Sequence, residues 1–191
     1  FVAPFLEKKL PEGLNLIVGA LAIAPLARII AIAVDPVVNS TLLNIGRMIS
    51  AAAEQSPIIM GFLLGGIMKM ICTSPLSSMA LTAMLGLDGL AMGIAAIACV
   101  GGSFTNGIIF DRLKLGERSN VIAVMLEPLT QADIITQNPI PIYGSNFFGG
   151  GLAGLAAAML GIINNAPGTA SPIPGLLAPF GFNPPLKVVA A

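Results

Sequence analysis

The chain lacks histidine and tryptophan, contains two cysteines, and has only 9% charged residues. Because histidine is the commonest general base and metal ligand, its absence argues against hydrolase or zinc chemistry. Cys72 and Cys99 lie in apolar runs without metal-ligand spacing, so we expect small buried residues. No phosphate-binding loop or catalytic triad is present, and the formal net charge is zero. We therefore predict no catalytic residue, no metal, no cofactor and no nucleic-acid partner.

The chain is instead rich in apolar residues, which make up 55% of its 191 positions, and its mean hydropathy is +0.92. Soluble domains carry about 25% charged residues, so this composition predicts an integral protein of the lipid bilayer. The 22 glycines and 15 prolines suit close helix packing and broken membrane helices. We predict an all-α, polytopic transmembrane protein. Residues 1–191 are expected to be part of one membrane domain, with a core of about 14–185, in a longer chain.

Apolar runs and proline positions divide the chain into helices. Residues 14–34 are long enough to span a bilayer, and Asp35-Pro36 is expected to end that helix. The mixed pattern after it predicts an amphipathic helix that lies at the membrane interface or packs along the bundle. Ser56-Pro57 is expected to open the next helix, because proline suits the first helical position. Two further spans are predicted, at residues 90–110 and 146–163.

Between these helices the sequence is polar or interrupted by proline. Residues 73–89 predict a loop with a short or re-entrant helix, and residues 111–120 form a basic loop that the positive-inside rule places in the cytoplasm. Residues 121–143 are broken by proline, and residues 164–172 form a second polar interruption. Two interruptions that flank one span are typical of the discontinuous helices of transporters. Residues 174–185 are expected to be irregular or re-entrant.

Glu127 is the leading candidate for solute binding. It follows an apolar run, so we expect it to be shielded from bulk water, and it precedes Pro128. Ionisable groups at membrane depth are costly and indicate a function, and a carboxylate accepts hydroxyl hydrogen bonds from a sugar-like ligand. The alternatives are an ion pair with Arg28 or Lys69, or a helix cap.

Further polar residues of the interruptions are candidates for the same site. Each has a structural alternative: an interfacial position, a helix cap, or packing between helices. Lys69, near the end of its helix, is expected to extend its ammonium group to the interface. The candidate substrate-binding residues besides Glu127 are Gln131, Asp133, Asn138, Asn164, Asn165 and Ser74.

Several motifs in order give the chain a family resemblance. These are Ser56-Pro57 before a glycine-rich helix, Thr73-Ser74-Pro75, Glu127-Pro128, Asn138-Pro139 and Asn164-Asn165. Together they resemble the PfoR-like membrane proteins, a branch of the EIIC permeases of the phosphoenolpyruvate-dependent sugar phosphotransferase system. The resemblance covers nearly the whole chain.

This resemblance implies an EIIC-like fold in the bacterial cytoplasmic membrane, with re-entrant helices and a homodimeric assembly. A Glu-Pro glutamate contacts the sugar in such permeases, and that role would fall on Glu127. Separate EIIB and EIIA proteins would be the phosphotransfer partners. The His-Gly pair that many EIIC permeases carry has no counterpart near Thr73-Ser74-Pro75. Because PfoR-like proteins are also described as toxin regulators, the alternative function is a membrane sensor with a transporter-like solute site.

Overall fold

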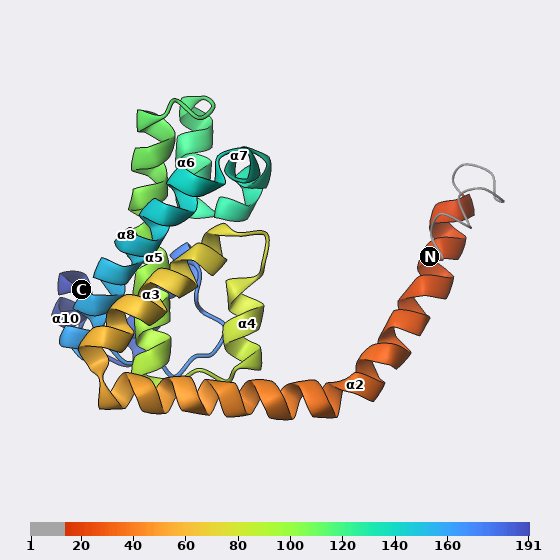
Figure 1. The fold of residues 1–191 in the computed structure, drawn as a ribbon, viewed down its shortest axis with the longest axis horizontal. Coiled ribbons are helices and arrows are strands. Elements are labelled where there is room, and N and C mark those ends of the chain that lie inside the picture. The colour runs from red at the N-terminus through yellow and green to blue at the C-terminus, as the bar shows by residue number, and fades with distance from the viewer. Residues whose placement is uncertain (1–13) are drawn as a thin grey trace. The chain divides into compact units, whose positions relative to one another are not determined.

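Helices form all the regular secondary structure of the computed structural model, which describes residues 14–191 (Figure 1). No strand occurs in that range, so the all-α prediction is confirmed for the described part of the chain. The chain divides into two units between Thr41 and Leu42, and each is described by itself.

The first unit contains most of a long helix, α2 (Leu14–Gln55), which continues into the second unit. The prediction that Asp35-Pro36 ends a helix is wrong, because α2 contains both Pro25 and Pro36. An internal proline removes one backbone hydrogen bond and can leave a helix unbroken. The part of α2 from Ala24 onward is long and apolar enough to cross a membrane, and Leu26 and Ile29 on it are exposed.

The last turns of α2 belong to the second unit and have two distinct faces. Ala53 is fully buried, and Leu42 and Ile49 pack against the core, whereas Arg47 and Glu54 are exposed. The predicted apolar face is therefore found at Leu42, Ile49 and Ala53, whereas Leu43 and Ile45, predicted for the same face, are exposed. The stretch is also not a separate helix.

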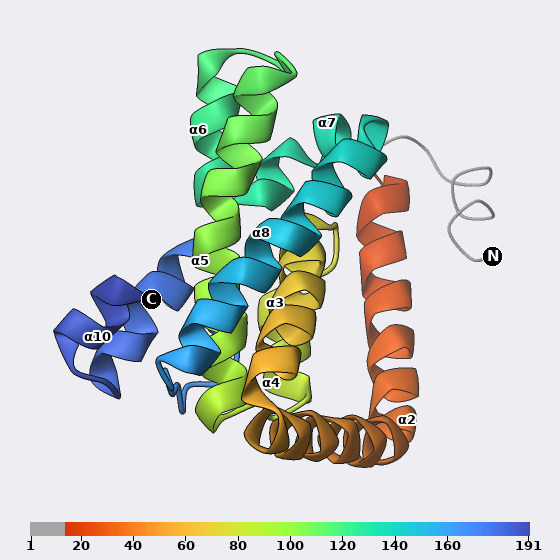
Figure 2. The ribbon, with the colours of Figure 1, turned by 60° about the vertical axis from the view of Figure 1, so that its left-hand side comes forward.

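Three helices form the centre of the second unit: α3 (Pro57–Thr73), α5 (Gly89–Arg112) and α8 (Pro139–Met159). They lie side by side in both ribbon views (Figures 1 and 2), and α3 packs most extensively against α8. α5 is long and apolar enough to cross a membrane, and most of its side chains are buried inside the protein. The helix predicted to open at Ser56-Pro57 and the span predicted from residue 90 are both found as helices. The span predicted at 146–163 is a helix that begins earlier, at Pro139, and ends at Met159.

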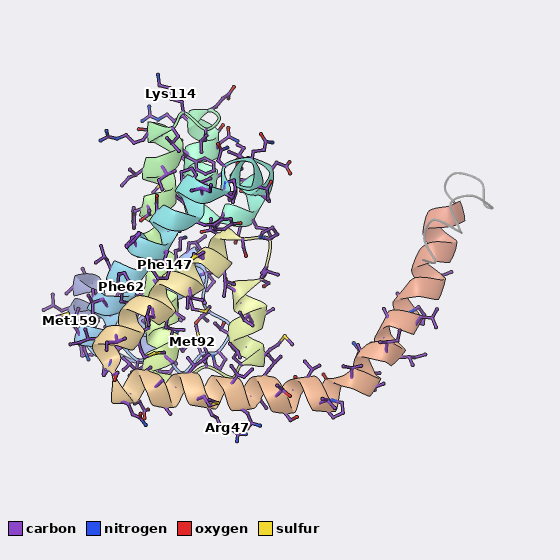
Figure 3. All side chains as sticks on the ribbon, viewed as in Figure 1. Arg47, Phe62, Met92, Lys114, Phe147 and Met159 are labelled. Atoms are coloured by element: carbon purple, nitrogen blue, oxygen red, sulfur yellow. The ribbon has the colours of Figure 1, made fainter. Side chains whose placement is uncertain are left out.

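Glycine faces let α3 and α8 approach backbone to backbone. A Cβ atom added at Gly65 would lie 2.6 Å from the carbonyl oxygen of Gly150, and one at Gly61 would lie 2.9 Å from that of Gly154. Residue numbers increase along α3 while those of their contact partners decrease along α8, so the two helices are antiparallel. Phe62 and Phe147 flank this contact with their ring centroids 5.6 Å apart, edge to face (Figure 3). Small residues at this interface are the expected device for close packing of membrane helices.

Short helices and loops connect the three central helices. The chain is broken at Glu127 and again at Asn138, as predicted for residues 121–143, and no helix occurs within 162–171. The remaining elements of the second unit are α4 (Ser78–Met84), α6 (Arg118–Leu126), η1 (Pro128–Gln131), α7 (Ala132–Gln137), α9 (Pro172–Leu177), η2 (Ala178–Gly181) and α10 (Pro185–Ala190).

The glycine contact predicts an asymmetric response to a single added methyl group. In Gly65→Ala the methyl meets the α8 backbone, and overpacking of this kind costs about 1–3 kcal/mol. In Gly144→Ala, also on α8, the added methyl has nothing within 4 Å, and the variant should instead gain about 0.5–1 kcal/mol from helix propensity. Thermal unfolding in detergent measures both variants, and equal melting temperatures would contradict this packing.

Candidate functional site

A break between two helices fixes the position of Glu127. α6 ends at Leu126, Glu127 adopts an extended conformation with φ −149° and ψ 96°, and Pro128 starts η1. Proline disfavours the helical conformation of the residue before it, which explains why the break falls here. The Glu127 N–H donates to Ala123 O at 2.9 Å, and its carbonyl accepts from Thr130 N at 3.1 Å and Thr130 Oγ1 at 2.7 Å. The backbone is thus held while the carboxylate remains available to a ligand.

A cavity of about 230 Å³ lies beside this carboxylate. Its lining comes from three separate parts of the chain: the end of α3 with the loop into α4, the break after α6, and the residue before α9. Segments that are far apart in the sequence therefore line one cavity, as is typical of small-molecule sites. The lining residues are Cys72, Ser74, Leu76, Ser77, Ser78, Met79, Glu127, Leu129 and Ser171.

Serine hydroxyls of this lining also hold its loops in place. Ser74 Oγ donates to Ile71 O at 2.7 Å and accepts from Leu76 N at 3.2 Å. Ser77 Oγ accepts from Ala80 N at 3.2 Å and so caps α4, while Ser78 Oγ donates to Ala170 O at 2.6 Å. A hydroxyl has one donor and two acceptor positions, so each of these retains capacity to accept. With the Glu127 carboxylate, the lining is rich in acceptors and suits a solute that carries several hydroxyl donors.

The structure shows Glu127 at a more open position than predicted. Its side chain is exposed rather than shielded from solvent, because the chain turns into η1 directly after it. Of the other predicted residues, Ser74 shares the cavity with Glu127.

Three predicted residues lie outside this cavity, on the segment after the break. Gln131 accepts a hydrogen bond from Asn120 Nδ2 at 2.7 Å and so braces η1 against α6. Asp133 lies in the first turn of α7, with an exposed side chain. Asn138 Nδ2 donates to Ile134 O at 3.1 Å at the end of α7.

Asn164 and Asn165 also lie outside the cavity and attach their loop to the start of α5. Asn164 N donates to Gly89 O at 2.9 Å, and Asn165 Oδ1 accepts from Gly89 N at 3.1 Å. Asn164 is fully buried, and its Nδ2 donates to Thr169 Oγ1 at 2.8 Å. These contacts fit the capping alternative, although the capped helix is α5 rather than the helix that precedes the two asparagines.

Lys69 is buried next to the cavity, contrary to its predicted interfacial position. Its exposed fraction is 0%, and its ammonium group donates to Cys99 O at 3.4 Å. The missing side chains of Gly102 on α5 and Gly150 on α8 provide the space, since a Cβ at either glycine would meet the lysine stem. The burial of Lys69 could not be predicted from the sequence, because it depends on which glycines of other helices face the lysine.

A buried polar layer continues from Lys69 along the three central helices. Asn106 Nδ2 on α5 donates to Thr73 Oγ1 on α3 at 3.3 Å, and Asn146 Nδ2 on α8 donates to both Asn106 Oδ1 and Ile142 O. Asn146 Oδ1 is buried without a hydrogen-bond partner within the described residues. The pattern of apolar runs gave no sign of this layer.

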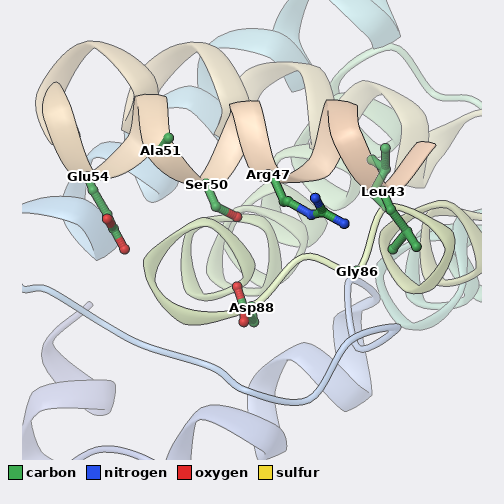
Figure 4. Close-up of a pocket in the computed structure, with 8 residues that line it drawn as sticks. Leu43, Arg47, Ser50, Ala51, Glu54, Gly86 and Asp88 are labelled. Atoms are coloured by element: carbon green, nitrogen blue, oxygen red, sulfur yellow. The ribbon is translucent and has the colours of Figure 1, made fainter. Parts of the chain in front are cut away.

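A second, larger cavity of about 440 Å³ lies between the end of α2 and the turn before α5 (Figure 4). Its polar side chains are Arg47, Ser50, Glu54 and Asp88, and it contains none of the predicted substrate-binding residues. Its charged groups are exposed on the surface. The smaller cavity is the candidate site because a helix break and three chain segments build it.

Comparison with known proteins identifies the family of the chain. The whole chain, residues 1–191, matches the family described as "Phosphotransferase system, EIIC". The chain belongs to this family. It is therefore a sugar permease component of the phosphotransferase system, whose EIIC units are membrane proteins that work with EIIB and EIIA partners. No curated protein and no solved structure matches the chain significantly.

The packing of Lys69 predicts that its stem matters more for stability than its charge. Lys69→Met keeps a long apolar stem between Gly102 and Gly150, and replacing a buried charge by an apolar group of similar size is often neutral or stabilising. Lys69→Ala leaves a cavity and should cost about 2–5 kcal/mol, as other large-to-small core changes do. Thermal unfolding of the two variants separates the effects. A loss in the methionine variant equal to that in the alanine variant would show that the ammonium group holds the helices.

Proposed function

We propose that this EIIC protein binds and translocates a sugar or related polar solute through the cavity beside Glu127. The observation that carries the proposal is the convergence of a carboxylate and four serines on one cavity at a helix break. Glu127 would accept hydrogen bonds from solute hydroxyls. Ser74, Ser77, Ser78 and Ser171 would complete the lining.

The remaining predicted residues have supporting roles in this proposal. Gln131 and Asn138 hold the segment that follows Glu127, and Asn164 and Asn165 hold the loop that leads to Ser171. Asp133 would approach the solute only after a movement of α7.

The protein would cross the bacterial cytoplasmic membrane several times. The basic loop that carries Arg112, Lys114 and Arg118 would lie in the cytoplasm, by the positive-inside rule. The short helices α4 and α9 on either side of the cavity would be re-entrant, because broken helices are tolerated at membrane depth where they line a cavity. The last turns of α2 would lie at the interface, with Arg47 and Glu54 toward water.

EIIB would phosphorylate the solute as it leaves the cavity, and the permease would form a homodimer within a larger membrane domain. The order of the Ser56-Pro57, Glu127-Pro128 and Asn164-Asn165 motifs supports the PfoR-like branch of the family. That branch also supports the second candidate function, a sensor that binds solute without moving it. Uptake of radiolabelled solute into proteoliposomes distinguishes the two, because a sensor binds but does not accumulate solute.

The proposal predicts a ligand-dependent thermal shift that requires Glu127. Full-length protein in detergent is heated with a panel of hexoses, hexitols and hexuronic acids. A hydrogen bond to a charged group contributes about 1.5–3 kcal/mol, so Glu127→Gln should weaken binding by roughly ten- to hundredfold. The stabilising ligand should then no longer raise the melting temperature at the same concentration.

Asp133→Asn is the matched control, since it also neutralises a carboxylate of the broken segment but lies outside the cavity. It should retain the shift. If the shift survives Glu127→Gln and disappears in Asp133→Asn, the solute site lies on α7 and the proposed cavity is incorrect.

A further inference from the structure

The larger cavity of about 440 Å³, here called the α2 cavity, combines apolar and charged lining residues. Its apolar part is formed by Leu43, which is 40% exposed, and by Leu85. Its charged part carries the guanidinium of Arg47 and the carboxylates of Glu54 and Asp88. Figure 4 shows the side chains of Arg47 and Glu54 extending from α2 toward the side on which Asp88 lies. This lining suits an amphiphile that carries both a negative and a positive charge.

Close backbone packing holds the two walls of the α2 cavity together. A Cβ atom added at Gly46 would collide with the carbonyl oxygen of Leu85, so α2 rests directly on the turn that follows α4. Gly86 in that turn has a left-handed backbone with φ +60°, and a Cβ there would lie 3.0 Å from the Leu43 side chain. The buried Gly46 and the turn glycine therefore fix the spacing of the walls.

The Asp88 carboxylate is not used to cap the helix that it precedes. Asp88 stands at the N-cap position of α5, where an aspartate usually accepts a backbone hydrogen bond, but its side chain forms no such bond. Asn165 Oδ1 accepts from Gly89 N at 3.1 Å instead, so another loop satisfies this helix end. No ion pair joins Arg47 to Glu54 or Asp88. The three charged groups of the α2 cavity therefore remain available to a ligand.

We propose that the α2 cavity binds the head group of a zwitterionic phospholipid with a primary ammonium group, as in phosphatidylethanolamine. Arg47 and Ser50 donate to the phosphate, since a guanidinium matches the geometry of phosphate oxygens. Glu54 and Asp88 accept hydrogen bonds from the ammonium group. The acyl chains leave the cavity past Leu43.

The order of the lining residues along α2 matches the order of groups along such a lipid. Leu43, Arg47, Ser50 and Glu54 follow one another at spacings of three or four residues, which places them on one face of the helix. In the lipid the phosphate likewise lies between the acyl chains and the ammonium group. An amphipathic helix at the membrane interface brings this face into the head-group layer.

The same lining selects against other head groups. A choline head group has no N–H to donate to Glu54 and Asp88, and a glycerol head group leaves a net negative charge beside both carboxylates. The bound lipid would connect α2 to the turn before α5. It would thus hold the end of the interfacial helix against the helical core and stabilise the folded protein.

Native mass spectrometry of the full chain in detergent tests this proposal. The protein is mixed with equal amounts of phosphatidylethanolamine, phosphatidylcholine and phosphatidylglycerol that carry identical acyl chains. We expect one retained ethanolamine lipid per chain, roughly tenfold above either competitor, because the competitors lack hydrogen bonds to a charged partner. Equal retention of the three lipids, or preference for the glycerol lipid, would overturn the proposal.

Charge variants separate the two halves of the head-group site. Arg47→Gln should weaken binding of the ethanolamine and choline lipids alike, by roughly tenfold, because both contain the phosphate. The double variant Glu54→Gln/Asp88→Asn should bind these two lipids equally, because the carboxylates recognise only the ammonium N–H groups. All three side chains are exposed, so the variants should fold, and their melting temperatures without lipid check this.

Arg112→Gln and Asp111→Asn are the matched controls, since both side chains are exposed at the other end of α5 and outside the α2 cavity. Each should keep the wild-type preference for the ethanolamine lipid. Loss of the preference in the controls, or its survival in the Glu54→Gln/Asp88→Asn variant, would refute the assigned roles.

A soluble head group distinguishes a lipid from a small phosphate ester. Glycerophosphoethanolamine carries the same charges without acyl chains, so it should displace the bound lipid only at far higher concentration. Displacement at equal concentration would show that the acyl chains contribute nothing and that the ligand is not a lipid. Lipid binding in detergent does not depend on solute transport, so a negative result would leave the proposed solute cavity beside Glu127 unaffected.

Discussion

The close approach of α3 and α8 is the contact on which the rest of the second unit depends. At Gly61 and Gly65 the backbone of α3 meets that of α8 without side chains between them. α5 closes the group, and the glycines at positions 102 and 150 make room for the stem of Lys69. Because these contacts leave so little free volume, the three helices hold their relative positions and the breaks at their ends are held in turn.

The candidate site follows from these fixed helices and from proline. The end of α3 and the loop after it supply Cys72, Ser74 and Ser77, while the break before Pro128 supplies Glu127. Ser78 joins this loop to the segment before α9 through its bond to Ala170. A site assembled from helix breaks keeps its backbone polar groups close to a cavity, where water or solute can satisfy them.

Local sequence signals predicted the boundaries well where one residue type decides them. Pro57 starts α3 and Pro128 follows the break, because proline fits a first helical turn. The start of α8 at Pro139 was missed, since that span was predicted to begin at residue 146. Pro36 failed as a boundary, since a proline inside a helix removes only one bond. The burial of Lys69 was beyond the sequence, because it depends on which faces of distant helices meet.

The most direct test of the account is solute protection of an introduced thiol in a Cys72→Ser, Cys99→Ser background. Ser77→Cys places the thiol in the cavity lining, and Ser119→Cys places one on an exposed turn of α6 outside it. Maleimide labelling is followed with and without the hexose, hexitol and hexuronic acid panel. The account predicts that a bound solute slows labelling at position 77 and leaves position 119 unchanged. Unchanged labelling at 77 in the presence of a solute that the protein demonstrably binds would contradict the assignment of this cavity.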